Sequence, residues 1–164
     1  MCTKNLCGSI QIPGCSAYCK AKQIFNRSIR KTPAAIHYCG HAEDVELAVR
    51  DAAGRGQTVR VRSGGHNYEG FCIGNQTAVI DVSCLKHISI NTASATIKIG
   101  SGITNRELYD YLSQYDIPFP SGTCPTVSAA GLTQGGGWGH SARKLGLDRF
   151  PLSMSVFPDH RILC

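Results

Sequence analysis

Three short strand segments and one helix in the first half of the chain constrain the fold more than any other feature. Apolar and β-branched residues predict strands at residues 35–38, 58–62 and 78–82, and an amphipathic helix at residues 43–55. Strands that alternate with a helix in this order form parallel neighbours in a sheet. The first half therefore predicts a small α/β unit with parallel strands.

Two helices are expected in this half. In the helix at 43–55, the residues Val45, Ala48, Val49 and Ala52 are expected on one buried face. A second helix is predicted earlier, at residues 16–30, because helix-compatible residues end there in a basic segment and Pro33 then forces an extended exit.

The pattern changes after residue 82. Isoleucines alternate with polar residues at 88–90 and 95–99, as in half-buried antiparallel strands. Thr104 and Glu107 form a capping box, which predicts a helix ended by Pro118 and Pro120. That helix is expected to point Leu108, Tyr111 and Leu112 toward the core. The fold class is therefore α+β, with two subdomains that meet near residue 83.

A glycine-containing loop follows the strand at 58–62 and reads VRSGGHNYEG over residues 61–70. Gly64 and Gly65 allow positive φ and close approach of the backbone to a ligand, so that successive N–H groups can point at a phosphate. His66 adds an imidazole to this loop. Taken alone, two glycines after a strand also fit an ordinary turn.

A second glycine-rich stretch, residues 120–139, reads PSGTCPTVSAAGLTQGGGWG. Glycine-dense stretches can be flexible, and a single cysteine such as Cys124 is often only a small buried side chain. Regularly spaced apolar residues favour an ordered loop, and these expected anchors are Val127, Ala129, Leu132 and Trp138.

Composition excludes several classes of protein. The chain has 164 residues, enough for one domain with its own core, and it contains no apolar run of membrane-spanning length. The net charge of +6 is spread along the chain rather than clustered, which argues against nucleic-acid binding. No secretion signal is seen, so a cytoplasmic location is expected. The nine cysteines match no common zinc pattern, so no metal is predicted and the expectation is free thiols.

The two loops together carry a resemblance to a known family. RSGGHNYEG, followed about sixty residues later by GTCPTVSAAGLTQGGGWG, resembles the PCMH-type FAD-binding domain of the vanillyl-alcohol oxidase superfamily, in the berberine bridge enzyme-like branch of bicovalent flavin oxidases. The resemblance runs from about residue 33 to the end of the chain. It implies an N-terminal extension with a helix at 1–32 and a PCMH-type domain at 33–164, divided into subdomains at 33–83 and 84–164.

Cofactor contacts follow from the resemblance, residue by residue. The loop formed by Arg62, Ser63, Gly64, Gly65, His66 and Asn67 is expected to hold the FAD pyrophosphate. His66 is implied to bond covalently to the 8α carbon of the flavin, and Cys124 to its C6 atom. The residues expected to contact FAD in the second loop are Cys124, Val127, Gly131, Gly136 and Gly137.

The reaction implied by the resemblance is hydride transfer from a substrate C–H bond to the flavin, followed by reoxidation with dioxygen to hydrogen peroxide. Substrates in this branch include sugars and secondary metabolites. The catalytic residues remain unknown and are expected in a C-terminal part, with the substrate domain, that lies beyond this chain. No membrane or nucleic-acid partner is expected.

The chain is also expected to be incomplete in its second subdomain. Residues 152–157 alternate like a strand, and 161–163 are expected to form the return strand of a hairpin cut short. An inactive or weakly folded fragment is therefore expected, with a complementing C-terminal fragment as a possible partner. Two alternatives stay open: a noncatalytic flavin-binding fragment, and a reductase of the same fold that binds FAD noncovalently.

Overall fold

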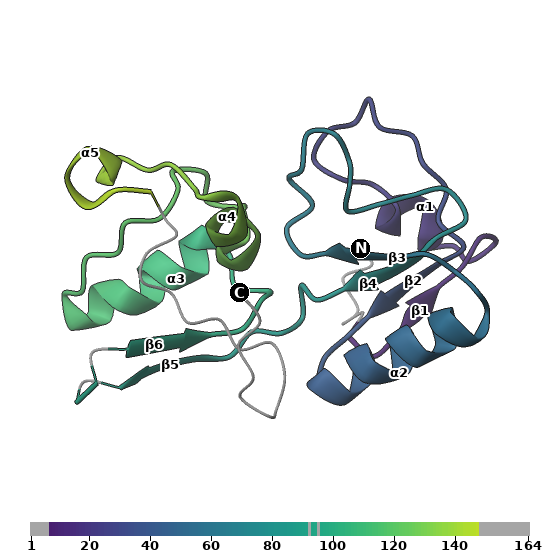
Figure 1. Cartoon of the computed structure of the whole chain (residues 1–164), viewed down its shortest axis with the longest axis horizontal. Coiled ribbons are helices and arrows are strands. Elements are labelled where there is room, and N and C mark those ends of the chain that lie inside the picture. Colours follow the sequence, from purple (N-terminus) through teal and green to yellow (C-terminus); the bar gives the residue numbers. More distant parts are fainter. Residues whose placement is uncertain (1–6, 92, 95, 148–164) are drawn as a thin grey trace. The chain divides into compact units, whose positions relative to one another are not determined.

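The chain folds into two compact units, Met1–Leu85 and Lys86–Cys164. The structure is a computed structural model that describes residues 7–91, 93–94 and 96–147 (Figure 1). Within these residues, no helix is long and apolar enough to cross a membrane. The strands expected at 152–157 and 161–163 lie outside the described residues.

The first unit contains four strands and two helices among its described residues: β1 (Ile10–Gln11), α1 (Tyr18–Ala21), β2 (Ala35–Tyr38), α2 (Ala42–Gly54), β3 (Val59–Arg62) and β4 (Ala78–Asp81). Its sheet has the order β1-β2-β4-β3. The strands β2, β4 and β3 run parallel, whereas β1 joins the edge of β2 antiparallel. The three predicted strands and their parallel arrangement are confirmed.

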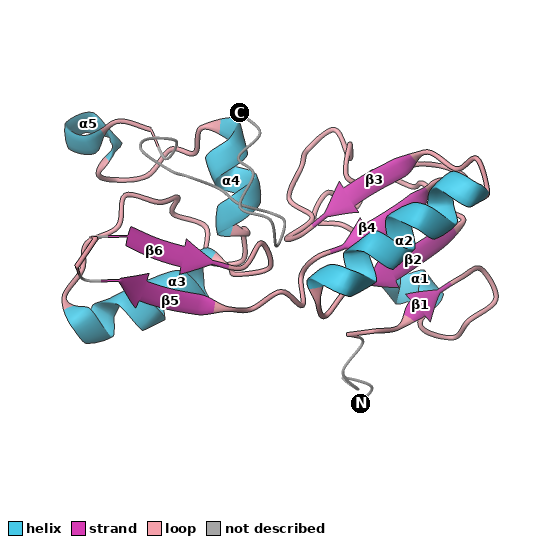
Figure 2. Ribbon diagram, turned by 60° about the horizontal axis from the view of Figure 1, so that its bottom comes forward, coloured by secondary structure: helices cyan, strands magenta, loops and turns pink. Residues whose placement is uncertain are grey.

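Helices cover both faces of this sheet, with α2 on one face and α1 on the other (Figure 2). Ile36 and Val79 pack with Tyr18 and Ala21 on the α1 face. Ile80 packs with Ala48 on the α2 face. All four residues of β4 are buried, and the first three are apolar, as suits a central strand that is covered on both faces. The last residue, Asp81, is charged.

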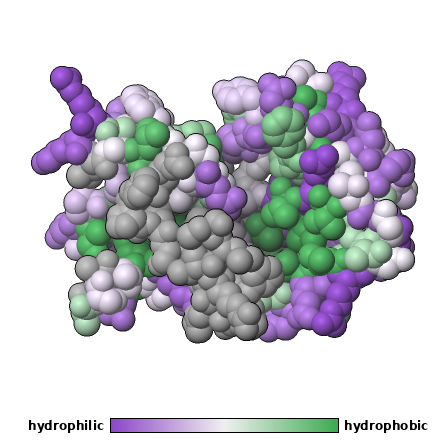
Figure 3. All heavy atoms as spheres, viewed as in Figure 1, coloured by the Kyte–Doolittle hydropathy of each residue, from purple (hydrophilic) through white to green (hydrophobic). Residues whose placement is uncertain are grey.

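The predicted inward face of α2 is correct in part. Ala48 and Ala52 are fully buried, and Val45 packs partly buried against the same core. Val49 is 43% exposed, so its assignment to the buried face was wrong. Leu47 is exposed as well, and Figure 3 shows hydrophobic side chains gathered on the surface of the first unit. The helix thus buries mainly its small residues against the sheet.

The N-terminal helix predicted at 16–30 is much shorter in the structure, since α1 ends at Ala21. The Asn26 side chain accepts a hydrogen bond from the backbone N–H of Ser28 at 3.1 Å, which closes a local turn in place of a helix. The N–H of Phe25 donates to the carbonyl of Gly65 at 3.0 Å instead of to a helical carbonyl. Long-range pairing therefore overrides the local helix preference of this segment.

A disulfide joins Cys7 to Cys84, 77 residues apart in the sequence. The expectation of free thiols is wrong for these two residues, because a pairing between distant residues leaves no local spacing signal. The free cysteines among the described residues are Cys15, Cys19, Cys39, Cys72 and Cys124. Burial raises the pKa of the Cys39 thiol to about 11, which leaves it an inert core residue.

The second unit contains a hairpin and a set of short helices: β5 (Ile88–Asn91), β6 (Thr96–Ile99), α3 (Asn105–Leu112), a 3₁₀ turn η1 (Ser113–Tyr115), α4 (Ala129–Gly135) and α5 (Ala142–Leu145). The strands β5 and β6 pair antiparallel, as predicted. The side chains of Leu108 and Leu112 are fully buried under this hairpin, with Tyr111 partly buried beside them. Thr104 and Glu107 form the expected capping box.

The stretch 120–139 is ordered, as expected, but it contains a helix, α4, that the glycine-rich sequence did not predict. Ala129 is buried and serves as an anchor, whereas Trp138 is 65% exposed, so its assignment as an anchor was wrong. The next residue, Gly139, is buried close to residue 121. A Cβ at that position would lie 1.9 Å from the carbonyl oxygen of Ser121, so the backbone itself makes the close contact.

Candidate functional site

The first candidate loop begins at Arg62, the last residue of β3. The Arg62 guanidinium is buried and forms an ion pair with Asp81 at the end of β4, with 2.5 Å between Nε and Oδ2. It also donates to the carbonyl of Ala21 at 2.7 Å and to the Tyr38 hydroxyl at 3.2 Å. The Arg62 side chain therefore ties the start of the loop to α1, β2 and β4.

The turn that follows places Gly64, Gly65 and His66 at the end of β3. Gly65 has a φ of +68°, which only glycine adopts without strain, so it turns the chain toward His66. Gly64 is exposed and His66 is half-buried. The His66 ring stacks on the ring of Phe25, with centroids 4.3 Å apart and planes 23° apart.

Asn67 closes the far side of this loop. Its side-chain carbonyl accepts a hydrogen bond from the N–H of Phe71 at 2.9 Å, and its backbone carbonyl accepts one from Gly70 at 3.1 Å. Ser63 is half-buried between Arg62 and the turn. The first unit thus brings together, in one loop, all six residues that the sequence assigned to it.

Asn105, at the start of α3, organises the second candidate loop. Its side chain is completely buried and donates to the carbonyls of Cys124 at 3.0 Å and Gly122 at 3.3 Å. Its amide oxygen accepts a hydrogen bond from the Ser121 hydroxyl at 3.0 Å. In return, the carbonyl of Val127 accepts the backbone N–H of Asn105 at 2.9 Å. Hydrogen bonds to Asn105 therefore hold the loop around Cys124 against the first turn of α3.

The Cys124 thiol is half-buried, with 3.6 Å between its Sγ and the hydroxyl oxygen of Thr126. Hydrogen bonding from the Thr126 side chain and backbone lowers the pKa of Cys124 below its ordinary value, because these donors favour the thiolate. A thiolate is the reactive form of cysteine toward carbon electrophiles. Exposure and a lowered pKa thus set Cys124 apart from the buried Cys39.

The remaining residues predicted in the second loop lie along α4 and just after it. Gly131 is an exposed residue of α4, and a Cβ added there would meet no heavy atom within 4 Å. Gly136 ends the helix with a φ of +77°. Gly137 is buried, and a Cβ there would clash with the Leu132 side chain at 2.2 Å. Val127 is half-buried between Cys124 and the helix.

Sequence reasoning missed two residues of these loops. Phe25 lies in the segment expected to be helical, and nothing local indicates its contact with His66 some forty residues later. Asn105 follows the capping-box residue Thr104, and that position alone gave no sign of complete burial. Its burial follows from the loop that folds onto it, so no signal in the sequence could have identified it.

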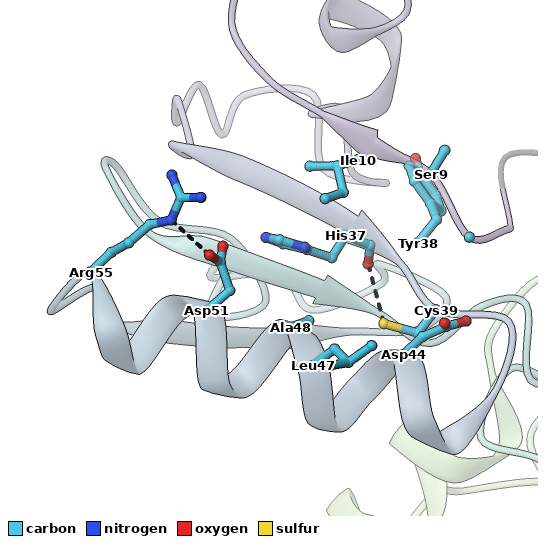
Figure 4. A pocket seen from close by; sticks show the side chains of 11 residues that line it. Ser9, Ile10, His37, Tyr38, Cys39, Asp44, Leu47, Ala48, Asp51 and Arg55 are labelled. Atoms are coloured by element: carbon cyan, nitrogen blue, oxygen red, sulfur yellow. Dashed lines mark hydrogen bonds and ion pairs between the residues drawn. The ribbon is translucent and has the colours of Figure 1, made fainter.

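A pocket of about 380 Å³ lies elsewhere in the first unit, between β1 and α2. Figure 4 shows the His37 ring extending from β2 into this space, with Ile10 on one side and Asp51 on the other. The Nε2 atom of His37 is buried, and the described residues give it no hydrogen-bond partner. Burial lowers the pKa of His37, so this side chain is held neutral. None of the loop residues predicted to bind a cofactor lines this pocket.

Each loop, taken by itself, has features that an anionic cofactor with an electrophilic ring requires. Exposed backbone at Gly64, a left-handed turn at Gly65 and the amide of Asn67 supply the N–H groups and space that a phosphate needs. His66 and Cys124 are the nucleophilic side chains of their respective loops. The residues present therefore fit the FAD group that the sequence resemblance implies.

Comparison with known proteins agrees with this assignment. The sequence profile described as FAD binding domain matches residues 33–150. FAD-linked oxidoreductase pynB of Aspergillus niger is 40% identical over 115 residues, which cover 70% of this chain and 21% of that protein. Reticuline oxidase of Eschscholzia californica is 37% identical over 128 residues, covering 76% of this chain and 24% of that protein.

Solved structures give the same result. BBE-like 1 of Physcomitrella patens superposes with a TM-score of 0.81 at 35% identity, covering 85% of this chain and 31% of that one. The 6-hydroxy-D-nicotine oxidase of Arthrobacter nicotinovorans superposes with a TM-score of 0.82 at 30% identity, covering 86% of this chain and 31% of that one. The chain thus spans between a fifth and a third of the length of these relatives.

The fold and the two loops define the class: a PCMH-type FAD-binding domain of FAD-linked oxidoreductases. Within that class, the chain belongs to the family described as FAD binding domain. Its similarity to reticuline oxidase and to BBE-like 1 confirms the resemblance seen in its sequence.

Proposed function

We propose that this chain is the FAD-binding part of an oxidase that holds its flavin covalently through His66 and Cys124. The observation that carries the proposal is the pair of nucleophilic side chains, each set in a glycine-containing loop, within a domain of FAD-linked oxidoreductases. Bound FAD would supply hydride acceptance from a substrate C–H bond and electron transfer to dioxygen, with hydrogen peroxide as product.

The first loop binds the cofactor through its backbone. Gly64, Gly65 and Asn67 direct N–H groups at the pyrophosphate, while Arg62 keeps the loop in place through its bond to Asp81. The His66 imidazole is held against Phe25 and would supply the nitrogen that bonds to the 8α carbon. In this step a C–H bond at that carbon would break, its proton would leave, and the flavin ring would take up the electron pair. Dioxygen would then reoxidise the flavin, with hydrogen peroxide as product, and the bond between Cys124 and C6 would balance in the same way. This unit therefore orients the cofactor from the end of β3.

The second loop supplies the other attachment. The lowered pKa of Cys124 raises its thiolate fraction, which supports bond formation to the flavin C6 atom. Asn105 binds the carbonyls of Cys124 and Gly122, which holds the backbone that carries the sulfur at the start of α3. Val127, Gly131, Gly136 and Gly137 are proposed to complete the contact surface for FAD.

The proposed substrate is a small molecule, and the FAD-binding domain does not indicate its chemical class. The relatives include proteins named reticuline oxidase and 6-hydroxy-D-nicotine oxidase, and a xylooligosaccharide oxidase gives the same fold. We propose that the catalytic base and the substrate contacts come from sequence outside these 164 residues. A C-terminal fragment that complements this chain is part of the same proposal.

Mass spectrometry of acid-precipitated protein tests covalent attachment. After incubation with FAD, the unmodified chain is expected to retain one flavin, and peptide mapping is expected to find it on His66 and Cys124. His66→Ala and Cys124→Ser each remove one of the two bonds and leave the other, whereas Cys72→Ser, at a half-buried cysteine, leaves both. Complete release of FAD on precipitation would favour the reductase of the same fold that binds FAD noncovalently. Retained flavin that gives no peroxide when substrate and the complementing C-terminal fragment are both supplied would favour a noncatalytic fragment.

A cytoplasmic location stays a prediction, and the Cys7–Cys84 bond gives a way to test it. Structural disulfides persist in oxidising compartments and are rare in the cytosol. Alkylation of thiols in intact cells, followed by peptide mapping, separates the two cases. Alkylated Cys7 and Cys84 would agree with the cytosol, and an intact bond would place the protein in an oxidising compartment.

A further inference from the structure

The segment that precedes the family match forms part of the His66 loop. The profile match begins at residue 33, yet residues 24–31 lie along the loop at 64–70. Asn26 donates to the carbonyl of Tyr68 at 2.8 Å, and Lys31 donates to that of Gly70 at 2.9 Å. The carbonyls of this loop are thus held by an upstream segment to which the match assigns nothing.

Phe25 contacts two consecutive residues of the loop, the backbone of Gly65 and the side chain of His66. Its backbone N–H donates to the carbonyl of Gly65 at 3.0 Å, and its ring stacks on the imidazole of His66 at 4.3 Å between centroids. The first contact fixes the backbone just before His66. The second restricts rotation of the imidazole about its side-chain bonds. Phe25 thus contacts both the backbone next to His66 and the plane of its ring.

Core packing does not explain the stack, because the Phe25 side chain is 55% exposed. An exposed phenylalanine gains little from burial, whereas an aromatic pair has a preferred geometry that selects among ring orientations. The nearby apolar residue Ile24 is 5% exposed and belongs to the core. Ile24 therefore packs in the core and holds the segment in place, whereas the ring of Phe25 stacks on His66.

We propose that Phe25 is the positioning residue of His66, and that its ring holds the imidazole in the orientation from which a nitrogen bonds to the flavin. The inference rests on the proposed covalent attachment at His66. Bond formation requires one nitrogen to approach the cofactor along one direction, so a ring free to rotate spends less time in the reactive orientation. Phe25 touches neither cofactor nor substrate in this role.

The first test needs no cofactor. In the flavin-free chain, the ring current of Phe25 is expected to displace the His66 imidazole proton resonances upfield, as measured by NMR. Phe25→Leu removes this displacement, and Phe25→Tyr retains it. Phe71→Leu serves as the matched control, because Phe71 is an exposed aromatic residue close to the same loop, at 65% exposure. Unchanged His66 resonances in Phe25→Leu would overturn the proposal.

The second test measures the rate at which acid-stable flavin accumulates on the Cys124→Ser background, where only His66 can attach. Phe25→Leu is expected to slow attachment about two- to tenfold at saturating FAD, the population change that an aromatic pair of ordinary strength supports. Phe25→Tyr restores the rate, and Phe71→Leu leaves it unchanged. Equal rates in all variants would overturn the inference.

The two tests separate failure of the inference from failure of the proposed function. If no acid-stable flavin forms even in the parent chain, covalent attachment at His66 is wrong, while the NMR displacement still reports the stack. Amide hydrogen exchange in β4 checks the fold of each variant. Loss of that protection in both Phe25→Leu and Phe25→Tyr would make Phe25 a core residue and overturn its positioning role.

Discussion

The buried ion pair between Arg62 and Asp81 is expected to be the most sensitive interaction in the first unit. Arg62→Met keeps an unbranched chain of similar length but removes every donor. Among the described residues, only Ser83 then donates to the Asp81 carboxylate, which is 2% exposed, through its N–H and its hydroxyl. The carbonyl of Ala21 and the Tyr38 hydroxyl also lose a donor.

The size of the effect follows from these contacts. A hydrogen bond to a charged group contributes about 1.5–3 kcal/mol, and a neutral one about 1 kcal/mol. Removing one partner of a buried ion pair costs about 3–5 kcal/mol. The guanidinium also donates charge-assisted hydrogen bonds to Ala21 and Tyr38, so the loss should lie in the upper part of that range. The free energy of opening of the first unit should fall by this amount.

Amide hydrogen exchange of Val79 and Ile80 in β4 measures this quantity locally, so that unfolding of the second unit does not obscure it. A loss of about 3–5 kcal/mol accelerates exchange by about two to three and a half orders of magnitude. Arg55→Met is the matched control, because its ion pair with Asp51 is exposed. That change should cost at most about 1 kcal/mol.

A second variant identifies the cause. If an orphaned buried charge dominates the cost, Arg62→Met combined with Asp81→Asn should be less destabilised than Arg62→Met alone. Equal exchange rates for Arg62→Met and Arg55→Met would refute the reasoning. So would a double variant that is less stable than Arg62→Met.

Three further outcomes follow from the structure. Because burial lowers the pKa of His37, the unfolded state binds a proton at this side chain more readily than the folded state does, and the free energy of unfolding should decrease as the pH falls below about 6.5. In a pH series of urea titrations, His37→Leu should make that decrease smaller. An unchanged dependence on pH would contradict this prediction. Cys84→Ser removes the disulfide to Cys7 and should lower the free energy of unfolding of the first unit by about 2–5 kcal/mol in urea titrations without reducing agent. A loss below about 1 kcal/mol would argue against the disulfide. Gly139→Ala should disrupt the second unit because its Cβ meets a carbonyl oxygen, whereas Gly131→Ala, in open space on α4, should be tolerated; equal melting temperatures would contradict this difference.

Much of the first unit could be predicted because its signals are local. The strands β2, β3 and β4 carry runs of β-branched and apolar residues, and α2 begins with acidic residues and ends in glycine. The capping box at Thr104 and Glu107 likewise lies within four residues. Such short-range patterns need no partner from elsewhere in the chain.

The missed features depend on distant partners. Residues 22–30 have helix-compatible side chains, but their backbone and ring contacts with the loop at 64–70 determine their structure. The Cys7–Cys84 bond spans 77 residues, and no spacing rule identifies it. Trp138 was expected to be an anchor because apolar residues recur regularly in its segment, but it is 65% exposed, and regular spacing alone does not show which of these residues meet the core.

The candidate site shows the same division. The glycines, His66 and Cys124 could be selected from two motifs, because such motifs report which residues a cofactor needs. The residues that hold them could not be selected in this way. Asn105 and Phe25 act through a buried amide and a ring stack, and neither has a sequence pattern of its own.

An NMR titration of the isotopically labelled chain with FAD tests the central claim most directly, since it reports which residues the cofactor meets. The account predicts that the amide signals of Gly64, Gly65 and Asn67 shift on addition of FAD, with further shifts around Cys124. Signals near His37, in the pocket between β1 and α2, should stay unchanged. Shifts confined to that pocket, or no shifts at all, would contradict the account.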